Sequence, residues 1–171
     1  MKILIMSDNH GRYELVHQLV MSLNDQVDYL IHCGDSEFAS DDGIWSYFDG
    51  AVKGNMDFDG EYPNQQVIST PHGNIYVTHG HLLAVNASNM GVVEYAKQEN
   101  AFLAFHGHTH RLYAEMKDGI FIANPGSLNH SRGDYPGTSY MIVEVTDRYI
   151  NVEYFDESQQ LIPTLTKHFE R

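Results

Sequence analysis

The chain has 171 residues, of which 42% are hydrophobic and 19% charged, so it can bury one sizeable core and is too apolar to be a disordered protein. Its 23 acidic and 10 basic residues give a formal net charge of −13, which disfavours long nucleic acids as partners. No apolar run approaches the ~20 residues that span a bilayer, so no membrane partner is expected.

The first two thirds of the chain alternate strand and helix patterns. Lys2–Met6 predicts a buried strand that starts too early to leave room for a signal peptide. The next segment predicts a helix with Leu15, Leu19, Val20 and Leu23 on one face. The other predicted elements of this part are strands at 29–32 and 51–53, a hairpin of strands at 66–70 and 74–78, a helix at 88–98 and a strand at 102–105.

The last third of the chain predicts antiparallel strands, at 112–116, 120–123, 140–145 and 149–155. There is no internal repeat or linker, so residues 1–171 are expected to form a single domain. Alternating strands and helices followed by a run of strands predict an α/β fold, a four-layer α/β/β/α sandwich of two mixed sheets flanked by helices. The single cysteine, Cys33, cannot form an internal disulfide, which favours a cytoplasmic location.

Five of the predicted strand ends carry polar residues of one chemical kind. In α/β sheets, ligands bind beyond the carboxyl ends of the strands, so these five loops are expected to converge. Carboxylate, amide and imidazole groups without a thiolate suit Mn²⁺, Fe²⁺, Zn²⁺, Co²⁺ or Ni²⁺ better than Ca²⁺ or Mg²⁺. The five segments are Asp8-Asn9-His10, Gly34-Asp35, Gly54-Asn55-Met56-Asp57, His79-Gly80-His81 and Gly107-His108-Thr109-His110.

These ordered segments resemble the signature of the calcineurin-like metallophosphoesterases, which runs D-x-H, GD, GN, H and GHxH. With Asn124-Pro125-Gly126-Ser127, the chain is similar to the small prokaryotic phosphodiesterase branch of that superfamily. The resemblance implies two divalent transition-metal ions, with Mn²⁺ as the first expectation. The implied ligands are Asp8, His10 and His110 for the first ion, Asn55, His79 and His108 for the second, and Asp35 as the bridge between them.

The resemblance also implies a reaction, the hydrolysis of a small phosphodiester by a hydroxide that bridges the two ions. Asp35 and Asn55 would then take part in catalysis, and Asn55 would also contact the substrate. Two divalent ions, two carboxylates and a hydroxide leave one net positive charge, which a phosphodiester would neutralise. The alternatives are a phosphomonoesterase acting on a small metabolite and a non-catalytic scaffold of the same fold that binds proteins.

One position departs from the superfamily pattern. Many members have a histidine after the GN pair that is thought to assist the leaving group, but this chain has Met56, whose thioether cannot donate a proton. Our hypothesis is that His81 supplies the acid instead. Arg132 is a candidate for binding a phosphate oxygen, with a solvated loop arginine as the alternative. Exposed strand edges or aromatic surface make a homo-oligomer conceivable.

Overall fold

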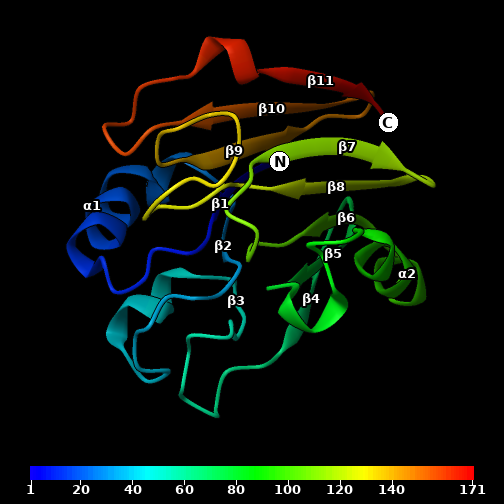
Figure 1. Ribbon diagram of the computed structural model, residues 1–171. Helices are drawn as coiled ribbons and strands as arrows, with labels where there is room; N and C mark the ends of the chain where they lie inside the picture. Colours follow the sequence, from blue (N-terminus) through cyan, green and yellow to red (C-terminus); the bar gives the residue numbers. More distant parts are fainter.

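The computed structural model describes residues 1–171 and contains two mixed β-sheets packed face to face (Figure 1). The six-stranded sheet has the order β11-β10-β9-β1-β2-β3, and the five-stranded sheet has the order β4-β5-β6-β8-β7. The strands of the larger sheet are β1 (Lys2–Met6), β2 (Tyr29–His32), β3 (Gly50–Ala51), β9 (Tyr140–Val145), β10 (Tyr149–Phe155) and β11 (Lys167–Glu170). Those of the smaller sheet are β4 (Gln65–Thr70), β5 (Gly73–Thr78), β6 (Ala101–Phe105), β7 (Tyr113–Lys117) and β8 (Ile120–Asn124).

Each sheet is parallel in one part and antiparallel in the rest. β1, β2 and β3 run parallel to one another, as do β5, β6 and β8, whereas β9, β10 and β11 form antiparallel pairs on the far side of β1. β4 and β7 pair antiparallel at the two edges of the smaller sheet. The parallel strands therefore end at a common edge in each sheet, and this is where the polar loops lie.

The core between the sheets follows from the alternation of side chains along the strands. Ile3 and Ile5 of β1 point toward the smaller sheet, in the same cluster as Val77 and Phe105. Successive side chains of a strand point to opposite faces, so Leu4 of β1 points outward to a second cluster with α1. The apolar run of β1 is therefore buried on both faces, as the sequence predicts.

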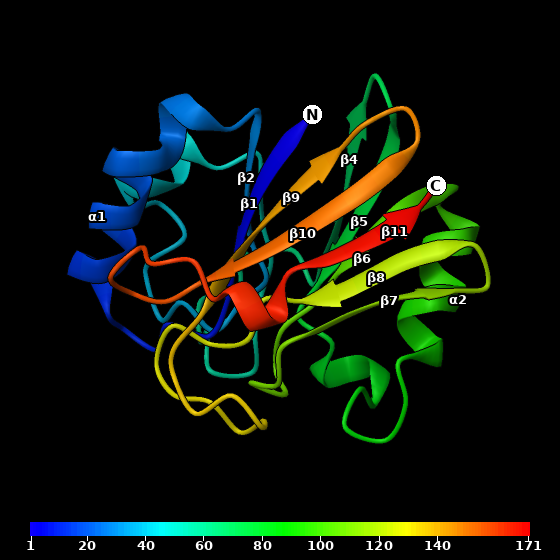
Figure 2. The same cartoon turned by 90° about the horizontal axis from the view of Figure 1, so that it is seen from above.

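Two α-helices cover the outer faces of the sandwich (Figure 2). α1 (Tyr13–Leu23) buries Val16, Leu19, Val20 and Leu23 against the larger sheet. α2 (Met90–Gln98) packs on the smaller sheet through β5, β6 and β8. The four-layer α/β/β/α arrangement is confirmed. Neither α-helix combines the length and the apolar character that a membrane crossing needs.

The structure corrects the sequence reading in several details. In α1, Val16 is fully buried while Leu15, expected on the apolar face, is only half-buried. α2 begins two residues later than the predicted 88–98, and the third strand is only Gly50–Ala51. The sequence reading missed β11 and four short 3₁₀ helices, at Asn24–Gln26, Gly43–Tyr47, His81–Leu83 and Pro163–Leu165.

Candidate metal centre

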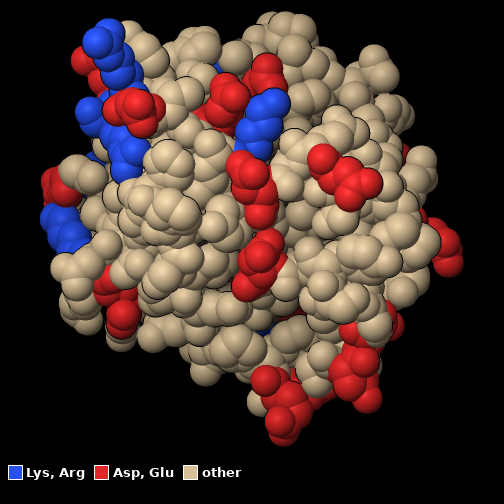
Figure 3. Space-filling view, turned by 180° about the vertical axis from the view of Figure 1, so that it is seen from behind, with Lys and Arg blue, Asp and Glu red and all other residues tan.

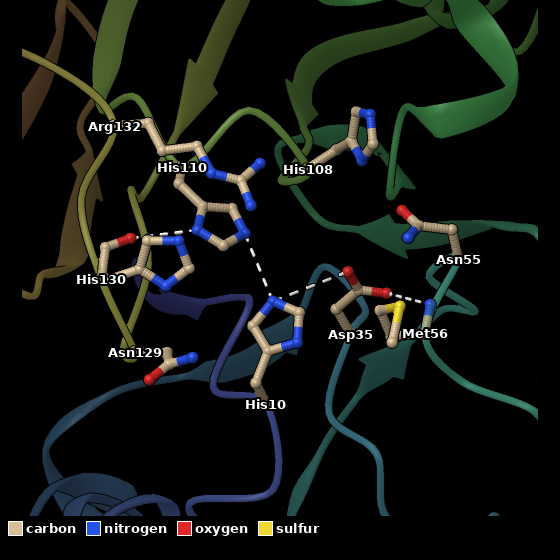
Figure 4. A pocket seen from close by; sticks show the side chains of 9 residues that line it. All are labelled: His10, Asp35, Asn55, Met56, His108, His110, Asn129, His130 and Arg132. Atoms are coloured by element: carbon tan, nitrogen blue, oxygen red, sulfur yellow. Dashed lines mark hydrogen bonds and ion pairs between the residues drawn. The ribbon is translucent and has the colours of Figure 1, made fainter.

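Four of the five polar loops line one cavity, and His79 of the fifth loop contacts Asp8 and Asp35 beside it. The cavity has a volume of about 330 Å³ and a single apolar lining residue, Met56. Its walls come from loops that follow β1, β2, β3, β6 and β8 (Figure 4). The lining residues are His10, Asp35, Asn55, Met56, His108, His110, Asn129, His130 and Arg132.

The backbone of these loops is unusual for the residues that occupy it. Asp8, Asp35, His108 and His110 have φ angles of 54°, 53°, 68° and 56°, and His10 has 45°. A residue with a side chain pays on the order of 1 kcal/mol for this left-handed region, so such residues cluster at functional sites. Backbone bonds between loops hold the conformation, among them Asp8 N–H to Gly34 O (3.0 Å) and His10 N–H to Asp35 O (3.1 Å).

Asp8, His10 and His110 form a first cluster whose ligand atoms lie close enough to hold one ion. Nε2 of His110 is 3.2 Å from Oδ1 of Asp8 and 3.3 Å from Nε2 of His10. Asp8 is fully buried and His110 is 2% exposed, while His10 is partly open to the cavity. These are the three residues that the sequence assigned to the first ion.

Asp8, Asp35 and His79 form a second cluster. Nε2 of His79 is 3.2 Å from Oδ1 of Asp8 and 3.5 Å from Oδ2 of Asp35. The same Oδ2 of Asp35 is 3.8 Å from Nε2 of His10. Asp35 thus lies between His10 and His79, where a bridging ligand would lie, although the residue common to both clusters is Asp8.

Asn55 and His108 complete the set predicted for the second ion. Both line the cavity, and His108 lies outside the two carboxylate–histidine clusters. The backbone N–H of His108 donates to Oδ2 of Asp8 (3.1 Å), which ties its loop to the shared carboxylate. The structure therefore brings five of the seven expected ligands together and places the other two on the wall of the same cavity.

The three histidines of the clusters use their second ring nitrogen on a group outside them, and one ring nitrogen of His108 also has a partner. His10 Nδ1 donates to Oε1 of Glu37 (2.7 Å), and His110 Nδ1 donates to the carbonyl of His130 (3.0 Å). Nδ1 of His79 shares a hydrogen bond with Nδ1 of His81 (3.1 Å). The Asn86 amide lies 3.1 Å from Nε2 of His108. Metal-binding histidines have such outer partners almost without exception, because the partner fixes the tautomer and the ring orientation.

The electrostatics of the two carboxylates differ. Burial would raise the pKa of Asp8, but hydrogen bonds from His110 and His79 hold that pKa well below its ordinary value. Burial raises the pKa of Asp35, against the opposing effects of His79 and the Met56 N–H. Burial would lower the pKa of His79, yet its contacts with Asp8 raise it. Two close carboxylates and several inward imidazole nitrogens are a donor set that divalent cations would stabilise.

His81 does not line the cavity. It opens a short 3₁₀ helix after β5, and its Nδ1 faces His79. Met56 does line the cavity, and its backbone N–H donates to Oδ1 of Asp35 (2.7 Å). If His81 replaces the missing acid, its proton would have to reach the cavity through His79. The sequence reading had expected His81 to act directly.

Arg132 lies on the cavity wall together with Asn129 and His130 (Figure 4). None of these three side chains has a hydrogen-bonding partner within the chain. Ser127 fixes their loop, because its Oγ accepts from the N–H groups of Asn129 and His130 and donates to the carbonyl of Asp8. The sequence left His130 ambiguous and gave no signal for Asn129, since a loop position alone does not show which way a side chain points.

The sequence reading also missed Asp57, which has no direct contact with the cavity. Its buried carboxylate accepts from the N–H groups of Asp35, Glu37 and Gly54, and from the Ser36 hydroxyl. It therefore joins the loop after β2 to the loop after β3. The only signal in the sequence is that it closes the Gly54-Asn55-Met56-Asp57 segment, which by itself predicts a turn.

Comparison with known proteins identifies the family. Residues 1–148 match the sequence model of the calcineurin-like phosphoesterase superfamily domain. The chain belongs to this superfamily. It is 31% identical over 165 residues to the probable metallophosphoesterase YsnB of Bacillus subtilis (strain 168), with 96% of each chain covered.

Solved structures with the same fold support this assignment. A conserved uncharacterized protein of Streptococcus pneumoniae TIGR4, a predicted phosphoesterase, has a TM-score of 0.96 and 34% identity over 99% of this chain and 97% of its own. Vacuolar Protein Sorting 29 of Cryptosporidium parvum has a TM-score of 0.78 and 17% identity over 99% and 98% of the two chains, so the likeness is one of fold. A metallophosphoesterase uses divalent ions, and the two carboxylate–histidine clusters are where this chain can hold them.

Proposed function

We propose that this calcineurin-like phosphoesterase hydrolyses small phosphodiesters with the help of two divalent transition-metal ions, Mn²⁺ being the first candidate. The observation that carries the proposal is the pair of carboxylate–histidine clusters that share Asp8 beside an open polar cavity. Asp8, His10 and His110 would hold one ion, and Asn55, His79 and His108 the other, with Asp35 between them.

The chain's own residues prepare the reaction in two ways. The outer hydrogen bonds of His10, His79 and His110 present their remaining ring nitrogens toward the clusters before any ion binds. The close inter-loop bonds fix the separation of the carboxylates. When bound, the two ions would supply an attacking hydroxide between them at neutral pH and offset the charge that develops on the phosphoryl oxygens.

Substrate binding is proposed for Arg132, Asn55 and their neighbours on the cavity wall. The guanidinium of Arg132 can bind a phosphate oxygen through two N–H groups, and Asn129 and His130 add unpaired polar groups beside it. A cavity of about 330 Å³ is near the lower limit of ligand pockets, which supports a small substrate. On the face seen in Figure 3, acidic side chains are spread widely and basic ones gather mainly in one corner, so no basic groove for nucleic acid crosses that face.

Two other functions compete with this proposal. A phosphomonoesterase would use the same clusters. A protein-binding scaffold would need none of them, and the complete set of ligand types therefore favours an enzyme over a scaffold with the fold of Vacuolar Protein Sorting 29.

The test measures hydrolysis of bis(p-nitrophenyl) phosphate and p-nitrophenyl phosphate by chelator-stripped protein titrated with Mn²⁺, Ni²⁺, Zn²⁺ or Mg²⁺. The Asp35→Asn variant should lose at least about 10²- to 10³-fold of the rate, because the carboxylate proposed to hold both ions loses its charge. Asp147→Asn, at an exposed turn, is the matched control and should keep full activity. Faster turnover of the monoester would reassign the substrate, and no turnover with any ion despite metal binding would favour the scaffold.

A further inference from the structure

The outer partners of the four histidines are not chemically equal. His110 has a carbonyl and His79 a neutral imidazole, and Nε2 of His108 accepts from the uncharged amide nitrogen of Asn86. His10 alone has a carboxylate, Oε1 of Glu37, at 2.7 Å from its Nδ1. A carboxylate on the outer nitrogen makes an imidazole a more basic ligand than a neutral acceptor does.

The backbone of Glu37 is fixed by contacts of its own loop. Its backbone has a φ of 60°, in the left-handed region, and its N–H donates to Oδ1 of the buried Asp57 (2.7 Å). Asp57 in turn binds the backbone of Asp35 and Gly54. The loop that carries the predicted bridging ligand thus also fixes the backbone from which the Glu37 side chain reaches His10.

The other carboxylates near the histidines are Asp8, Asp35 and Asp57. Asp8 belongs to both clusters, and Oδ2 of Asp35 is at similar distances from Nε2 of His79 (3.5 Å) and Nε2 of His10 (3.8 Å). Asp57 adds a negative charge near His79 of the second cluster, but its carboxylate is held by its own donors and makes no hydrogen bond to a histidine ring. Glu37 is therefore the one carboxylate that hydrogen-bonds the outer ring nitrogen of a predicted ligand, and it does so in the first cluster.

We infer that Glu37 is a positioning residue that makes the two metal positions unequal, so that the ion held by Asp8, His10 and His110 binds more tightly and enters first. The inference rests on the two-ion centre of the proposed function but not on its substrate. Through Nδ1 of His10, Glu37 holds Nε2 toward the first cluster and adds a negative charge behind it. The second position, whose histidines lack such a partner, would fill at higher metal concentration.

The experiment is a calorimetric titration of chelator-stripped protein with Mn²⁺, without substrate. Wild type should show two separate binding steps. Glu37→Gln keeps the size and a hydrogen-bond acceptor and removes only the charge, so the tight step should weaken by about 10- to 100-fold while the weak step changes little. Glu37→Ala, which also removes the acceptor, should weaken the tight step further.

Asn86→Ala is the matched control, because it removes the outer partner of His108. Its tight step should be unchanged, and any effect should fall on the weak step. Urea denaturation of the metal-free variants checks that each is folded as stably as wild type. Two indistinguishable steps in wild type, or equal weakening of both steps in Glu37→Gln, would overturn the inference. Ordered binding of two ions by a protein that hydrolyses neither ester would instead remove the proposed activity and leave the role of Glu37 intact.

Discussion

At the end of the sheets where β1, β2 and β5 finish, the chain buries its polar side chains, whereas at the opposite end its turns are open to solvent. Every buried polar or charged residue lies in or beside the loops of the first end, including Asp8, Asp35 and Asp57. At the other end, Asp118 and Asp147 lie in exposed turns. Whether a polar side chain is buried therefore depends on the end of the sheets at which it lies and not on its residue type.

The two ends also differ in why residues adopt positive φ. Asp118 and Gly119 form the tight turn between β7 and β8 with φ of 51° and 82°, which Asp-Gly favours in a hairpin. His10, His108 and His110 adopt similar angles without such a local preference. Positive φ outside a tight turn indicates that hydrogen bonds to other loops hold the backbone of the site in place. The end where β1, β2 and β5 finish, here called the ligand end, thus fixes the positions of side chains, whereas the opposite end reverses the direction of the chain.

The largest expected effect comes from removing Asp57, the carboxylate that joins two ligand loops. Asp57→Ala leaves four donors unpaired in a buried place, so the free energy of unfolding of the metal-free protein should fall by about 3–5 kcal/mol. Urea denaturation measures this change. Asp147→Ala, at the opposite end, should stay within about 0.5 kcal/mol of wild type. Similar losses in the two variants would contradict the contrast between the ends.

A smaller effect is expected from pH, through His32 at the end of β2. Its Nε2–H donates to Asn9 (2.8 Å) and its Nδ1 accepts from the Gly34 N–H (3.1 Å), so both ring nitrogens are used in the neutral form. Burial lowers the pKa of His32 to about 4. An unfolded histidine takes up a proton below a pH of about 6.5, and the folded one does not. Stability should therefore fall as the pH drops from about 6.5 toward 4, with no contribution from His32 above that range.

The measurement compares urea denaturation of metal-free wild type and His32→Gln at pH 7 and pH 5. Wild type should lose about 1–2 kcal/mol more than the variant between these values, because glutamine can donate and accept without titrating. Equal losses in both proteins would show that His32 does not couple folding to protons. The other titrating groups are present in both proteins and cancel.

The sequence predicts much of the ligand end because the polar segments follow one another in a recognisable order. Five polar segments at strand ends, with Asp8, His10 and His110 among them, place the site, and the structure brings those three together. The strands themselves follow from apolar runs such as Lys2–Met6, whose burial on both faces leaves little choice of structure. Periodicity also predicts α1, since its buried residues repeat at helical spacing.

The sequence fails where a role depends on contact and not on pattern. Glu37 acts through one side-chain hydrogen bond and Asp57 through four, and such contacts leave no periodic pattern in the sequence. His81 follows a predicted ligand by two positions, yet its ring lies behind His79 and outside the cavity lining. β11 was missed because Lys167-His-Phe-Glu170 carries one apolar residue, Phe169, whose packing on Phe121 becomes visible only in the fold.

The smallest expected effect is at the opposite end, where Lys97 of α2 pairs with Asp118 (3.1 Å). Both side chains are about half exposed, at 46% and 52%, so water and salt screen the pair. A double-mutant cycle of Lys97→Ala and Asp118→Asn should give a coupling energy of about 0.2–1 kcal/mol that shrinks as salt is added, and asparagine tolerates the positive φ of Asp118. A coupling as large as the loss in Asp57→Ala would mean that this end, too, depends on fixed polar contacts.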